Sequence, residues 1–555
     1  MSPERQPLLK IEGLTVDLPA HADRRHAVED VTLTVHRDEI LCVVGESGSG
    51  KSVLSRAILG LYPSRHVRPS AGRILYGGVN LLDAPADEMR RLRGDRIAMI
   101  FQEPMTALNP VMTIGRQIDE VLQCHGQTSS ENRRARVLGV LAAVNLPEPA
   151  QILAAYPHQL SGGQRQRAMI AMALSLEPDV LIADEPTTAL DVTTQAQILA
   201  LIREIQARRR MGVIFITHDF GVVAEIADSI AVMQYGRIVE QGSAAQVLGS
   251  PVADYTRSLL AAVPRLMPGV RQSFDGAPVV LAVKDLRKTY RSAGGFLGGG
   301  ARRVDALRSV TFSLRRGETL GIVGESGSGK STVARCVTRL VDPDAGSILL
   351  DGEDIAMLGR RALRPLRRRM QMVFQDPYSS LNPRRTVGQL IAEGPIIHGQ
   401  NSAQAMRRAH ELLDLVGLDP KVSGRFPHEF SGGQRQRIGL ARALALDPAI
   451  LVADEPVSAL DVSVQAQVLR LIADIRARLG LSVLFITHDL RVASQVCDAI
   501  AVMRSGEIVE MGPVRQVFED PRHAYTRELL AAVPGRQWSA GREASLRGEA
   551  TSLAE

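Results

Sequence analysis

Residues 45–52 read GESGSGKS, and the same eight residues recur at positions 324–331. Each copy follows a short apolar run and precedes a helix-forming segment, which is the arrangement of a phosphate-binding loop between a strand and a helix. Glycines let the backbone approach phosphate oxygens closely, and amides at the start of the helix donate hydrogen bonds to them. Two copies in the same context predict two nucleotide-binding sites.

Three further segments occur in pairs, and the two members of each pair are 270 residues apart (for example 431 − 161). They are SGGQRQR at 161–167 and 431–437, IADEP at 182–186 with VADEP at 452–456, and FITHD at 215–219 and 485–489. A shared offset indicates a tandem duplication. The two loop lysines are 279 residues apart (330 − 51), so small insertions separate the halves between the loop and SGGQ.

Length and composition indicate a globular protein of at least two domains. A chain of 555 residues is too long for one hydrophobic core, and 45% hydrophobic with 23% charged residues is ordinary for globular domains. No apolar run reaches about eighteen residues, and the N-terminus lacks the apolar segment of a signal peptide, so we expect a soluble, cytoplasmic protein. The net charge of +6 (66 − 60) gives little support for a nucleic-acid partner.

The cysteines Cys42, Cys124, Cys336 and Cys497 are far apart in the sequence. Their spacing fits neither a set of metal ligands nor a disulfide framework. We therefore expect buried, reduced thiols.

The pattern of apolar residues predicts an α/β fold. Alternating, β-branched stretches open each half and predict strands, the last of which leads into the glycine loop. The later apolar runs VLIAD, VIFIT, ILVAD and VLFIT are typical of parallel strands buried on both faces. With helices between them, the halves are expected to be two tandem P-loop NTPase domains. Each should carry an N-terminal antiparallel β region and an inserted helical subdomain, at about residues 115–155 and 388–424.

Composition also suggests the domain boundaries. A first domain is expected at residues 1–264, a linker containing proline and glycine at 265–280, a second domain at 281–535 and a disordered tail at 536–555. The segment GGFLGGG at 294–300 lies between two predicted strands and is interpreted as a hairpin loop. Membrane contact through Phe296 and Leu297 is the alternative.

Each glycine loop has candidate roles for its polar residues. Lys51 and Lys330 are expected to reach the β- and γ-phosphates of ATP, and Ser52 and Ser331 to ligate Mg²⁺. A merely structural glycine turn would leave the lysines unexplained. The loop residues assigned to the nucleotide are Gly45, Ser47, Gly48, Gly50, Lys51, Ser52 and Val53 in the first half and Gly324, Ser326, Gly327, Gly329, Lys330, Ser331 and Thr332 in the second.

Two acidic pairs follow apolar strands. Asp184 and Asp454 end these strands, where a carboxylate can hold Mg²⁺. Glu185 and Glu455 come next, and because side chains alternate along a strand, we expect them to face the attacking water as its base or orienting group. Adjacent acids that only cap a strand end are the alternative, but this would not require the following proline or the repetition.

A glutamine and a histidine complete each set. Gln102 in IFQEP and Gln375 in VFQDP fit residues that contact Mg²⁺ and sense the γ-phosphate. His218 and His488 end further apolar strands and can hydrogen-bond the γ-phosphate, which makes them candidate catalytic residues. A lone histidine is more often structural, but the accompanying motifs favour function here.

Taken together, GESGSGKS, FQEP and FQDP, SGGQ, ADEPTTALD and ADEPVSALD, and ITHD resemble the nucleotide-binding domains of ABC ATPases, twice over and across nearly the whole chain. In that family SGGQ closes over the γ-phosphate bound at the opposite domain. The resemblance implies one site that joins Lys51, Ser52, Gln102, Asp184, Glu185 and His218 to Ser431, Gly432, Gly433 and Gln434. It implies another that joins Lys330, Ser331, Gln375, Asp454, Glu455 and His488 to Ser161, Gly162, Gly163 and Gln164. Asp191 and Asp461 match the loop that crosses between the sites.

Finer matches resemble the ATPases of importers of the oligopeptide, dipeptide and nickel group. They include YSSLNPRRTVGQLIAEG after Gln375 and the paired tails ADYTRSLLAAVP and HAYTRELLAAVP. Leu18 stands where the family usually places an aromatic that stacks on adenine, whereas the second half has Tyr290. The first site is therefore expected to bind ATP more weakly. Phe430 replaces the usual leucine before SGGQ, and the cysteine cluster found in the tails of some relatives is absent.

The resemblance implies ATP and Mg²⁺ as cofactors and two transmembrane permeases as partners. An extracytoplasmic binding protein would act through the permeases, and the chain would lie on the cytoplasmic face of the inner membrane as a peripheral subunit. Peptides are the favoured cargo, ahead of nickel, glutathione or a peptide-like antibiotic. The alternative is a soluble tandem ATPase acting on ribosomes or DNA, which the short connector and the absence of zinc-spaced cysteines disfavour. A regulatory pseudo-ATPase is disfavoured by the intact Glu185 and Glu455.

The segments PMTALNP at 104–110 and PYSSLNP at 377–383 follow the two glutamines. By resemblance, they help to form the groove that receives a short cytoplasmic helix from each permease. We expect changes at Tyr378 or Leu381 to reduce coupling more than nucleotide affinity.

Overall fold

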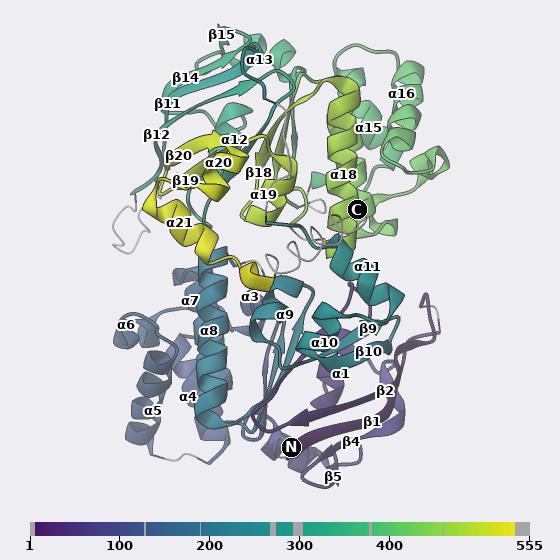
Figure 1. Ribbon diagram of the computed structural model, residues 1–555, viewed down its shortest axis with the longest axis vertical. Coiled ribbons are helices and arrows are strands. Elements are labelled where there is room, and N and C mark those ends of the chain that lie inside the picture. Colours follow the sequence, from purple (N-terminus) through teal and green to yellow (C-terminus); the bar gives the residue numbers. More distant parts are fainter. Residues whose placement is uncertain are drawn as a thin grey trace, which may run out of the picture. The chain divides into compact units, whose positions relative to one another are not determined.

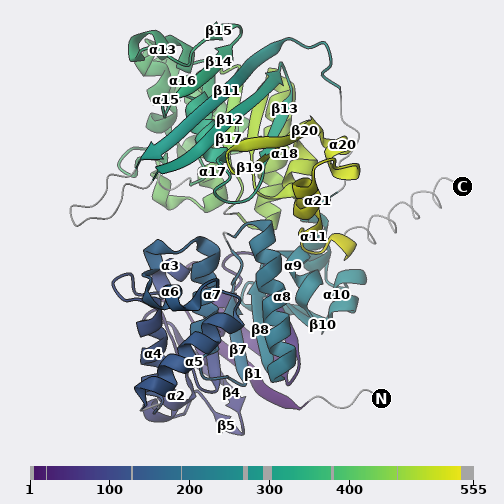
Figure 2. The same cartoon turned by 90° about the vertical axis from the view of Figure 1, so that its left-hand side faces the viewer.

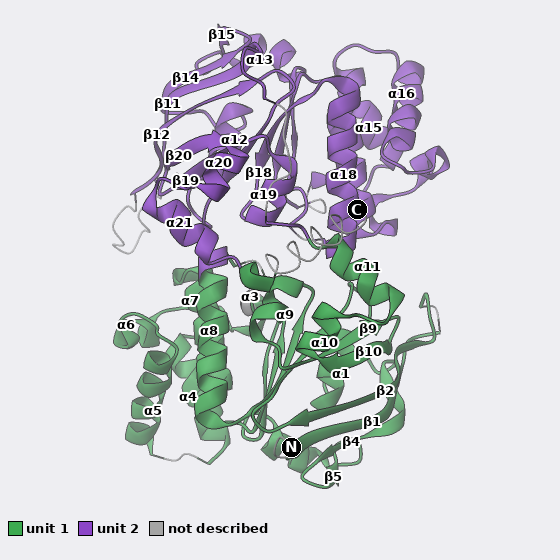
Figure 3. Cartoon of the chain, in the orientation of Figure 1, with its two compact units in different colours: residues 1–190, 194–263, 534–555 green, residues 191–193, 264–533 purple. Residues whose placement is uncertain are grey.

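The computed structural model describes residues 6–20, 22–126, 129–188, 190–266, 273–291, 303–376, 380–458 and 460–538. The chain divides into two compact units (Figure 3). Unit 1 comprises Met1–Leu190, Thr194–Val263 and Pro534–Glu555, and unit 2 comprises Asp191–Thr193 and Pro264–Val533. Within each unit, helices surround β-sheets (Figures 1 and 2).

Unit 1 contains, among its described residues, an antiparallel sheet and a mainly parallel one. The four-stranded antiparallel sheet has the order β2-β1-β4-β5, with β2 His26–His36, β1 Pro7–Asp17, β4 Arg68–Tyr76 and β5 Val79–Asn80. The six-stranded sheet has the order β10-β9-β3-β8-β7-β6, with β10 Arg237–Ser243, β9 Ser229–Gln234, β3 Ile40–Val44, β8 Gly212–Thr217, β7 Val180–Asp184 and β6 Ile97–Ile100. Only β10 runs antiparallel to its neighbour in this sheet.

The helices of the first half include the predicted inserted subdomain. Helices α4, α5 and α6 form a group beside α7 in both views (Figures 1 and 2), between the glycine loop and SGGQ in the sequence. The helices are α1 Lys51–Ile58, α2 Ala86–Leu92, α3 Pro104–Ala107, α4 Ile114–Cys124, α5 Ser130–Ala143, α6 Pro149–Ala154, η1 Pro157–Gln159, α7 Gly162–Ala173, α8 Val192–Arg209, α9 Phe220–Ile226, α10 Ala244–Gly249 and α11 Asp254–Ala262.

In unit 2 the two sheets are continuous. A single pair, Ser309 with Glu507, joins β12 to β20. The resulting ten-stranded sheet has the order β15-β14-β11-β12-β20-β19-β13-β18-β17-β16. Its strands are β11 Val279–Arg291, β12 Arg303–Arg315, β13 Thr319–Val323, β14 Ala345–Leu350, β15 Glu353–Asp354, β16 Met370–Val373, β17 Ile450–Asp454, β18 Ser482–Ile486, β19 Ala499–Arg504 and β20 Glu507–Pro513.

The helices of the second half repeat the plan of the first. Helices α15 and α16 with η2 are the counterpart of the inserted subdomain. The helices with described bounds are α12 Lys330–Val337, α13 Arg360–Arg367, α15 Val387–Ile397, α16 Ser402–Leu415, η2 Pro420–Gly424, η3 Pro427–Glu429, α17 Gly432–Leu444, α18 Val462–Leu479, α19 Leu490–Val496, α20 Val514–Glu519 and α21 Ala524–Ala531.

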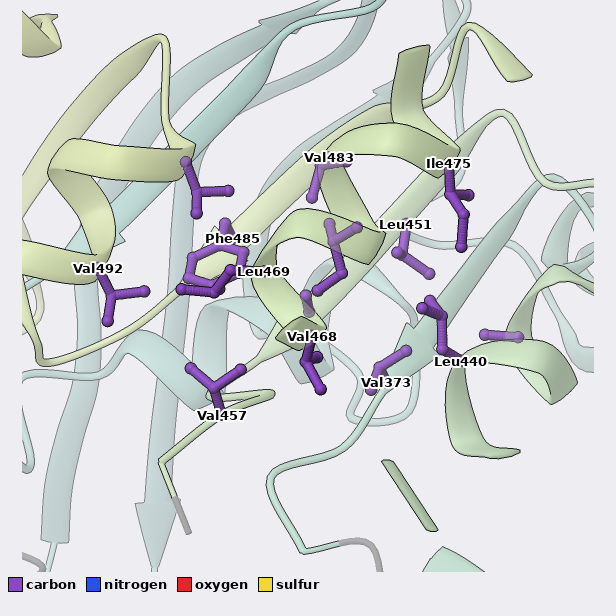
Figure 4. Close-up of a cluster of buried hydrophobic side chains, with 14 of the residues drawn as sticks. Val373, Leu440, Leu451, Val457, Val468, Leu469, Ile475, Val483, Phe485 and Val492 are labelled. Carbon is purple, nitrogen blue, oxygen red and sulfur yellow. The ribbon is translucent and has the colours of Figure 1, made fainter. Parts of the chain in front are cut away.

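Central parallel strands form the core of each unit. Every residue of β3, β7 and β8 is buried in unit 1, as is every residue of β13, β17 and β18 in unit 2. In unit 2, Leu469 and Ile475 of α18 pack with strand residues Leu451, Val483 and Phe485 in one cluster (Figure 4). Burial on both faces explains why these strands read as continuous apolar runs. It also fixes their carboxyl ends, where the acidic pairs lie.

The predicted fold class and both inserted subdomains are confirmed. Among the described residues, no helix combines the length and the apolar character needed to cross a membrane. The prediction for the cysteines is wrong at one position, because Cys124 at the end of α4 is exposed, whereas the other three are buried. The predicted hairpin loop at 294–300, most of the predicted tail and the central part of the linker lie outside the described residues.

The two units carry a cysteine at different members of one pair of equivalent positions. In unit 1 it lies in a central strand, and in unit 2 it lies at the end of a helix. Cys42 lies in β3 of unit 1, and Ala227 is the C-cap of α9. In unit 2 the corresponding residues are Gly321 of β13 and Cys497 at the end of α19. A Cβ added to Gly321 would lie 2.6 Å from the Sγ of Cys497. The Cys497 side chain therefore occupies the space beside Gly321.

Gly321→Ala should overpack unit 2 and lower the free energy of unfolding by about 1–3 kcal/mol. Cys497→Ala should relieve the clash, so the double variant should lose less than the sum of the two single changes. Denaturant unfolding of the four proteins in the cycle measures the coupling. Strict additivity would show that the two residues do not compete for the same space.

Candidate nucleotide-binding sites

Both glycine loops are packed tightly against neighbouring backbone. Gly50 caps α1 with a φ of 107°, and an added Cβ would lie 2.3 Å from the carbonyl oxygen of Ala27. At Gly45 an added Cβ would lie 2.2 Å from another backbone oxygen. Gly324 and Gly329 make the same close approaches in unit 2. Glycine is required at these positions both for the left-handed conformation and for the space.

The loop lysines are buried and held by backbone carbonyls. Lys51 is 6% exposed, and its Nζ donates to the carbonyls of Gly45 at 2.7 Å and Glu46 at 2.9 Å. Lys330 is 5% exposed and donates to the two equivalent carbonyls at 2.8 and 2.7 Å. Burial lowers the pKa of Lys330, although the charges of Glu455 and neighbouring acids oppose this shift. The loops therefore present a compact positive charge where an anion can dock.

The serine that follows each lysine contacts the strand aspartate. Ser52 Oγ lies 3.1 Å from Asp184 Oδ1, and Ser331 Oγ lies 3.0 Å from Asp454 Oδ1. Burial raises the pKa of Asp184, and the charge of Glu185 adds to this while the serine hydrogen bond opposes it. Hydroxyl and carboxylate oxygens are the donors that Mg²⁺ prefers, so these pairs fit a magnesium site.

The glutamate of each acidic pair is held by the predicted glutamine and histidine. Gln102 Nε2 donates to Glu185 Oε2 at 2.8 Å, and His218 Nδ1 lies 3.1 Å from Glu185 Oε1. In unit 2 the Gln375 amide lies 2.8 Å from the Glu455 carboxylate, and the His488 imidazole nitrogen lies 3.2 Å from it. The predicted glutamine, glutamate and histidine thus form one connected group in each unit. Thr188 also donates to Glu185 at 3.0 Å, a contact that the sequence analysis did not identify.

The electrostatics of this group keep the glutamates ionised. Burial raises the pKa of Glu185, but its hydrogen bond with His218 and that residue's charge outweigh burial and lower the pKa to about 2. The pKa of Glu455 is lowered in the same way. Burial acts to lower the pKa of His488, yet the contact with Glu455 raises it. An ionised carboxylate in this position can accept a hydrogen bond from water.

The expected reason for the direction of the glutamate side chain is wrong. Strands β7 and β17 end at Asp184 and Asp454, so the alternation of a strand does not reach the next residue. Glu185 has a φ of 48° and Glu455 a φ of 46°, in the left-handed region. A backbone turn, anchored by the Glu185 amide on the Ile216 carbonyl at 2.9 Å, separates the two carboxylates instead.

Each SGGQ segment begins a helix with a reciprocal cap. Ser161 Oγ accepts from the Gln164 amide at 3.2 Å, while the Gln164 side chain accepts from the Ser161 amide at 3.0 Å. Ser431 and Gln434 form the same capping box in unit 2. The glycines between them make up the first turns of α7 and α17, whose amides form an anion-attracting helix N-terminus.

One glycine of each signature allows close helix packing. A Cβ added to Gly163 would lie 2.7 Å from the Thr194 side chain, and one added to Gly433 would lie 2.3 Å from Val464. The preceding residues, Gly162 and Gly432, have more space around them. Gly163 and Gly433 are therefore explained by packing against α8 and α18.

The remaining candidates lie near these elements. Asp461 is the N-cap of α18, and Asp191 directly precedes α8. Tyr290 of β11 is 39% exposed, whereas Leu18 packs partly buried against the core of unit 1. The other predicted loop residues differ in exposure. Ser47, Gly48, Ser326 and Gly327 are exposed at the loop tips. Val53 and Thr332 are half-buried in the first turns of α1 and α12.

Two tyrosines at the glycine loops were missed by the sequence analysis. The hydroxyl of Tyr255 in α11 accepts from the Glu46 amide at 3.3 Å and donates to Glu46 Oε2 at 3.2 Å. Tyr525 in α21 accepts from the Glu325 amide, also at 3.3 Å. Burial raises the pKa of Tyr525 to about 12, so its hydroxyl stays protonated. The paired tail sequences signalled a shared feature, but nothing in them indicated a contact with the loop.

The proposed permease-contacting segments are described only in part. Tyr378 lies outside the described residues. Leu381 is 2% exposed, which places it in the core, so its replacement would also disturb packing. Phe430, the unusual residue before SGGQ, is 5% exposed and lies under the guanidinium of Arg425 at 4.8 Å.

Comparisons with known proteins give two matching families and several close relatives. The family described as ABC transporter matches residues 28–188 and 307–458. The family described as the oligopeptide/dipeptide transporter C-terminal region matches residues 239–282 and 509–555. The glutathione import ATP-binding protein GsiA of Salmonella choleraesuis (strain SC-B67) is 48% identical over 558 residues, covering 95% of this chain and 89% of the relative. GsiA of Escherichia coli O157:H7 is 47% identical with the same coverage.

Tyr255→Phe should weaken nucleotide binding at the first loop. Loss of the hydroxyl leaves the Glu46 amide without this acceptor, at a cost of about 1–3 kcal/mol. Part of that cost should appear as a higher Kd for ATP, measured by titration with the second loop disabled by Lys330→Ala. Tyr76→Phe is the matched control, because its hydroxyl bonds Asp179 at 2.7 Å rather than the loop. Equal Kd values for the two variants would contradict a role in positioning the loop.

Proposed function

The chain belongs to the ABC transporter family, and we propose that it is the ATP-hydrolysing subunit of an importer of glutathione or other short peptides. The observation that carries this proposal is the complete set of lysine, serine, aspartate, glutamate, glutamine and histidine contacts in both units. The cargo class is supported by the names of the GsiA relatives and by the matching oligopeptide/dipeptide transporter region.

Each ATP is proposed to bind between a loop of one half and the signature of the other. Lys51, Ser52, Gln102, Asp184, Glu185 and His218 would work with Ser431, Gly432, Gly433 and Gln434, and the second set with Ser161, Gly162, Gly163 and Gln164. The amides at the starts of α7 and α17 suit this role because a helix N-terminus attracts anions. Fusion of the halves raises their effective concentration for such pairing. Asp191 and Asp461, each beside the start of a long helix, are proposed to link the two sites.

The residues of each unit divide the work of phosphoryl transfer. Lys51 and the loop amides bind and orient the phosphates, and Ser52, Asp184 and Gln102 would hold Mg²⁺. When bound, Mg²⁺ supplies positive charge that offsets the charge on the phosphates. Glu185, ionised and held by Gln102 and His218, orients the attacking water and accepts its hydrogen bond. Release of Glu185 from Gln102 would free that carboxylate oxygen for water.

The family supports a proposal for the partners and the location. Two transmembrane permeases would carry the solute, and an extracytoplasmic binding protein would deliver it to them. The chain would then lie at the cytoplasmic face of the inner membrane as a peripheral subunit. Among the described residues, no observation favours the alternative of a soluble ATPase acting on ribosomes or DNA.

Glu185→Gln and Glu455→Gln should each retain ATP binding and lose turnover. Removing the carboxylate that orients water should reduce the ATPase rate on the order of 100-fold at the affected site. Single-turnover assays in the assembled transporter measure the rate, and nucleotide titration measures binding. Glu204→Gln, on the exposed face of α8, is the control and should leave both unchanged. Near-normal total turnover in either glutamate variant would assign that site a regulatory role.

The purified chain alone should show low ATPase activity that rises on reconstitution with its permeases and a loaded binding protein. Parallel reconstitutions with glutathione, a tripeptide without a thiol, and nickel identify the cargo. Stimulation by nickel alone would overturn the peptide assignment. Full activity without permeases, together with co-sedimentation with ribosomes or DNA, would favour the soluble alternative.

A further inference from the structure

A short segment lies between the site glutamine of each unit and the inserted helical subdomain. This LNP segment comprises residues 107–113 in unit 1 and 380–386 in unit 2, which share the offset of the two glutamines (375 − 102 = 273). It ends directly before α4 or α15. Both LNP segments overlap the stretches that are proposed to contact the permeases. The element that holds each segment therefore decides where a movement of that segment is passed on.

In unit 1 the LNP segment is held by Gln117, a residue of α4 that is 7% exposed. The side-chain oxygen of Gln117 accepts from the Asn109 amide at 2.9 Å. Its Nε2 donates to the carbonyls of Asn109 at 3.1 Å and Met112 at 3.0 Å. Because α4 begins the inserted subdomain, these three bonds attach the LNP segment to that subdomain.

Unit 2 holds its LNP segment with a different side chain. Leu390 stands at the position of Gln117 (390 − 117 = 273), and its side chain has no group that can form these bonds. Instead, Arg442 of α17 donates from Nη1 to the Ser380 carbonyl at 2.5 Å. Met172 stands at the position of Arg442 in unit 1 (442 − 172 = 270) and cannot donate such a bond. The side-chain attachment of unit 2 therefore leads to the helix that begins at SGGQ.

The surroundings of Arg442 make this attachment the stronger of two in unit 2. The side chain is half-buried, and burial lowers the pKa of Arg442 while the charge of Glu393 opposes this shift. Glu393 of α15 also pairs with Arg385 of the LNP segment at 2.8 Å, but these side chains are 40% and 46% exposed. An ion pair this exposed contributes little, whereas a charge-assisted hydrogen bond in a half-buried place holds its partner firmly.

Helix α17 can carry a movement from this attachment to the signature. Gly432–Leu444 form one helix with Ser431 as its N-cap, and Arg442 lies in its last turn. The rise of an α-helix places Arg442 roughly 16 Å along the axis from Ser431. A short helix moves as a rigid body, so a shift of the LNP segment at Arg442 also shifts SGGQ.

On the premise that the LNP segments contact the permeases as proposed above, we propose that Arg442 is a positioning residue that couples one permease directly to the SGGQ of α17. That signature is the one proposed to act on the nucleotide at Lys51. A permease movement at the second half is thus passed to the first ATP site. In unit 1 the same movement reaches α4 through Gln117, so the two permease contacts are not equivalent.

The test compares Arg442→Met with the matched variant Gln117→Leu. Each introduces the residue that the other unit carries at the equivalent position, so both are compatible with this fold. The readout is the ATPase rate of the complete transporter with a glutathione-loaded binding protein, divided by the rate of the chain alone. Arg442→Met should lower this ratio roughly threefold or more, a usual effect of cutting one contact in a coupled network. Gln117→Leu should lower it less.

Two further measurements separate positioning from a general loss of structure. Arg442→Lys should keep most of the ratio, because an ammonium group can donate to the same carbonyl. The Kd for ATP at each loop should stay unchanged in Arg442→Met, as titrated with the other loop disabled by Lys51→Ala or Lys330→Ala. If Arg442→Met proves unstable, Gln117→Leu with Met172→Arg carries the test. This double variant builds the attachment of unit 2 into unit 1 and should exceed Gln117→Leu in the ratio.

Four results would overturn the proposal: an unchanged ratio in Arg442→Met, an equal loss in Gln117→Leu, a raised Kd for ATP at the second loop, or no gain in the double variant. The premise is tested by the parent protein. A parent that its permeases do not stimulate would show the proposed function to be wrong, and the role of Arg442 with it. A stimulated parent that Arg442→Met matches would show that only the role of Arg442 is wrong.

Discussion

A buried ammonium group inside each glycine loop is the constraint on which the rest of the structure depends. A charge that is only about one-twentieth exposed must be compensated, and the carbonyls of Gly45 and Glu46 do so for Lys51. Turning these carbonyls inward requires a loop that only glycine can form. The loop in turn requires rigid supports, which are the fully buried strand β3 before it and helix α1 after it. The same chain of requirements holds in unit 2.

The sequence was sufficient to predict features that depend on local pattern. The loops, the apolar strands and the inserted helical subdomains all carry their signal within a few residues. The chemistry of the Glu185 group could also be predicted in outline, because each member ends or follows a recognisable apolar strand. Its geometry could not, since the left-handed turn at Glu185 depends on a backbone contact with Ile216.

Contacts between residues far apart in the chain could not be predicted from the sequence, because they depend on tertiary packing. Tyr255 and Glu46 are 209 residues apart, and no periodicity connects them. The contact between Arg24 and Gly48 depends on the path of a hairpin whose loop has no regular pattern. The exposure of Cys124 depends on which face of α4 the subdomain buries. In all these cases the tertiary packing, not the local sequence, decides.

Each tyrosine contact joins the end of a half to its beginning. Glu46 receives its hydroxyl partner from a residue 209 positions later, and Glu325 from one 200 positions later. During synthesis the N-terminal domain generally folds first, so the first loop gains its tyrosine only after almost the whole first half has left the ribosome. A chain truncated before α11 would keep every residue of the first loop but lack this anchor. Tight nucleotide binding by the first loop should therefore be reached only when synthesis of that half is nearly complete.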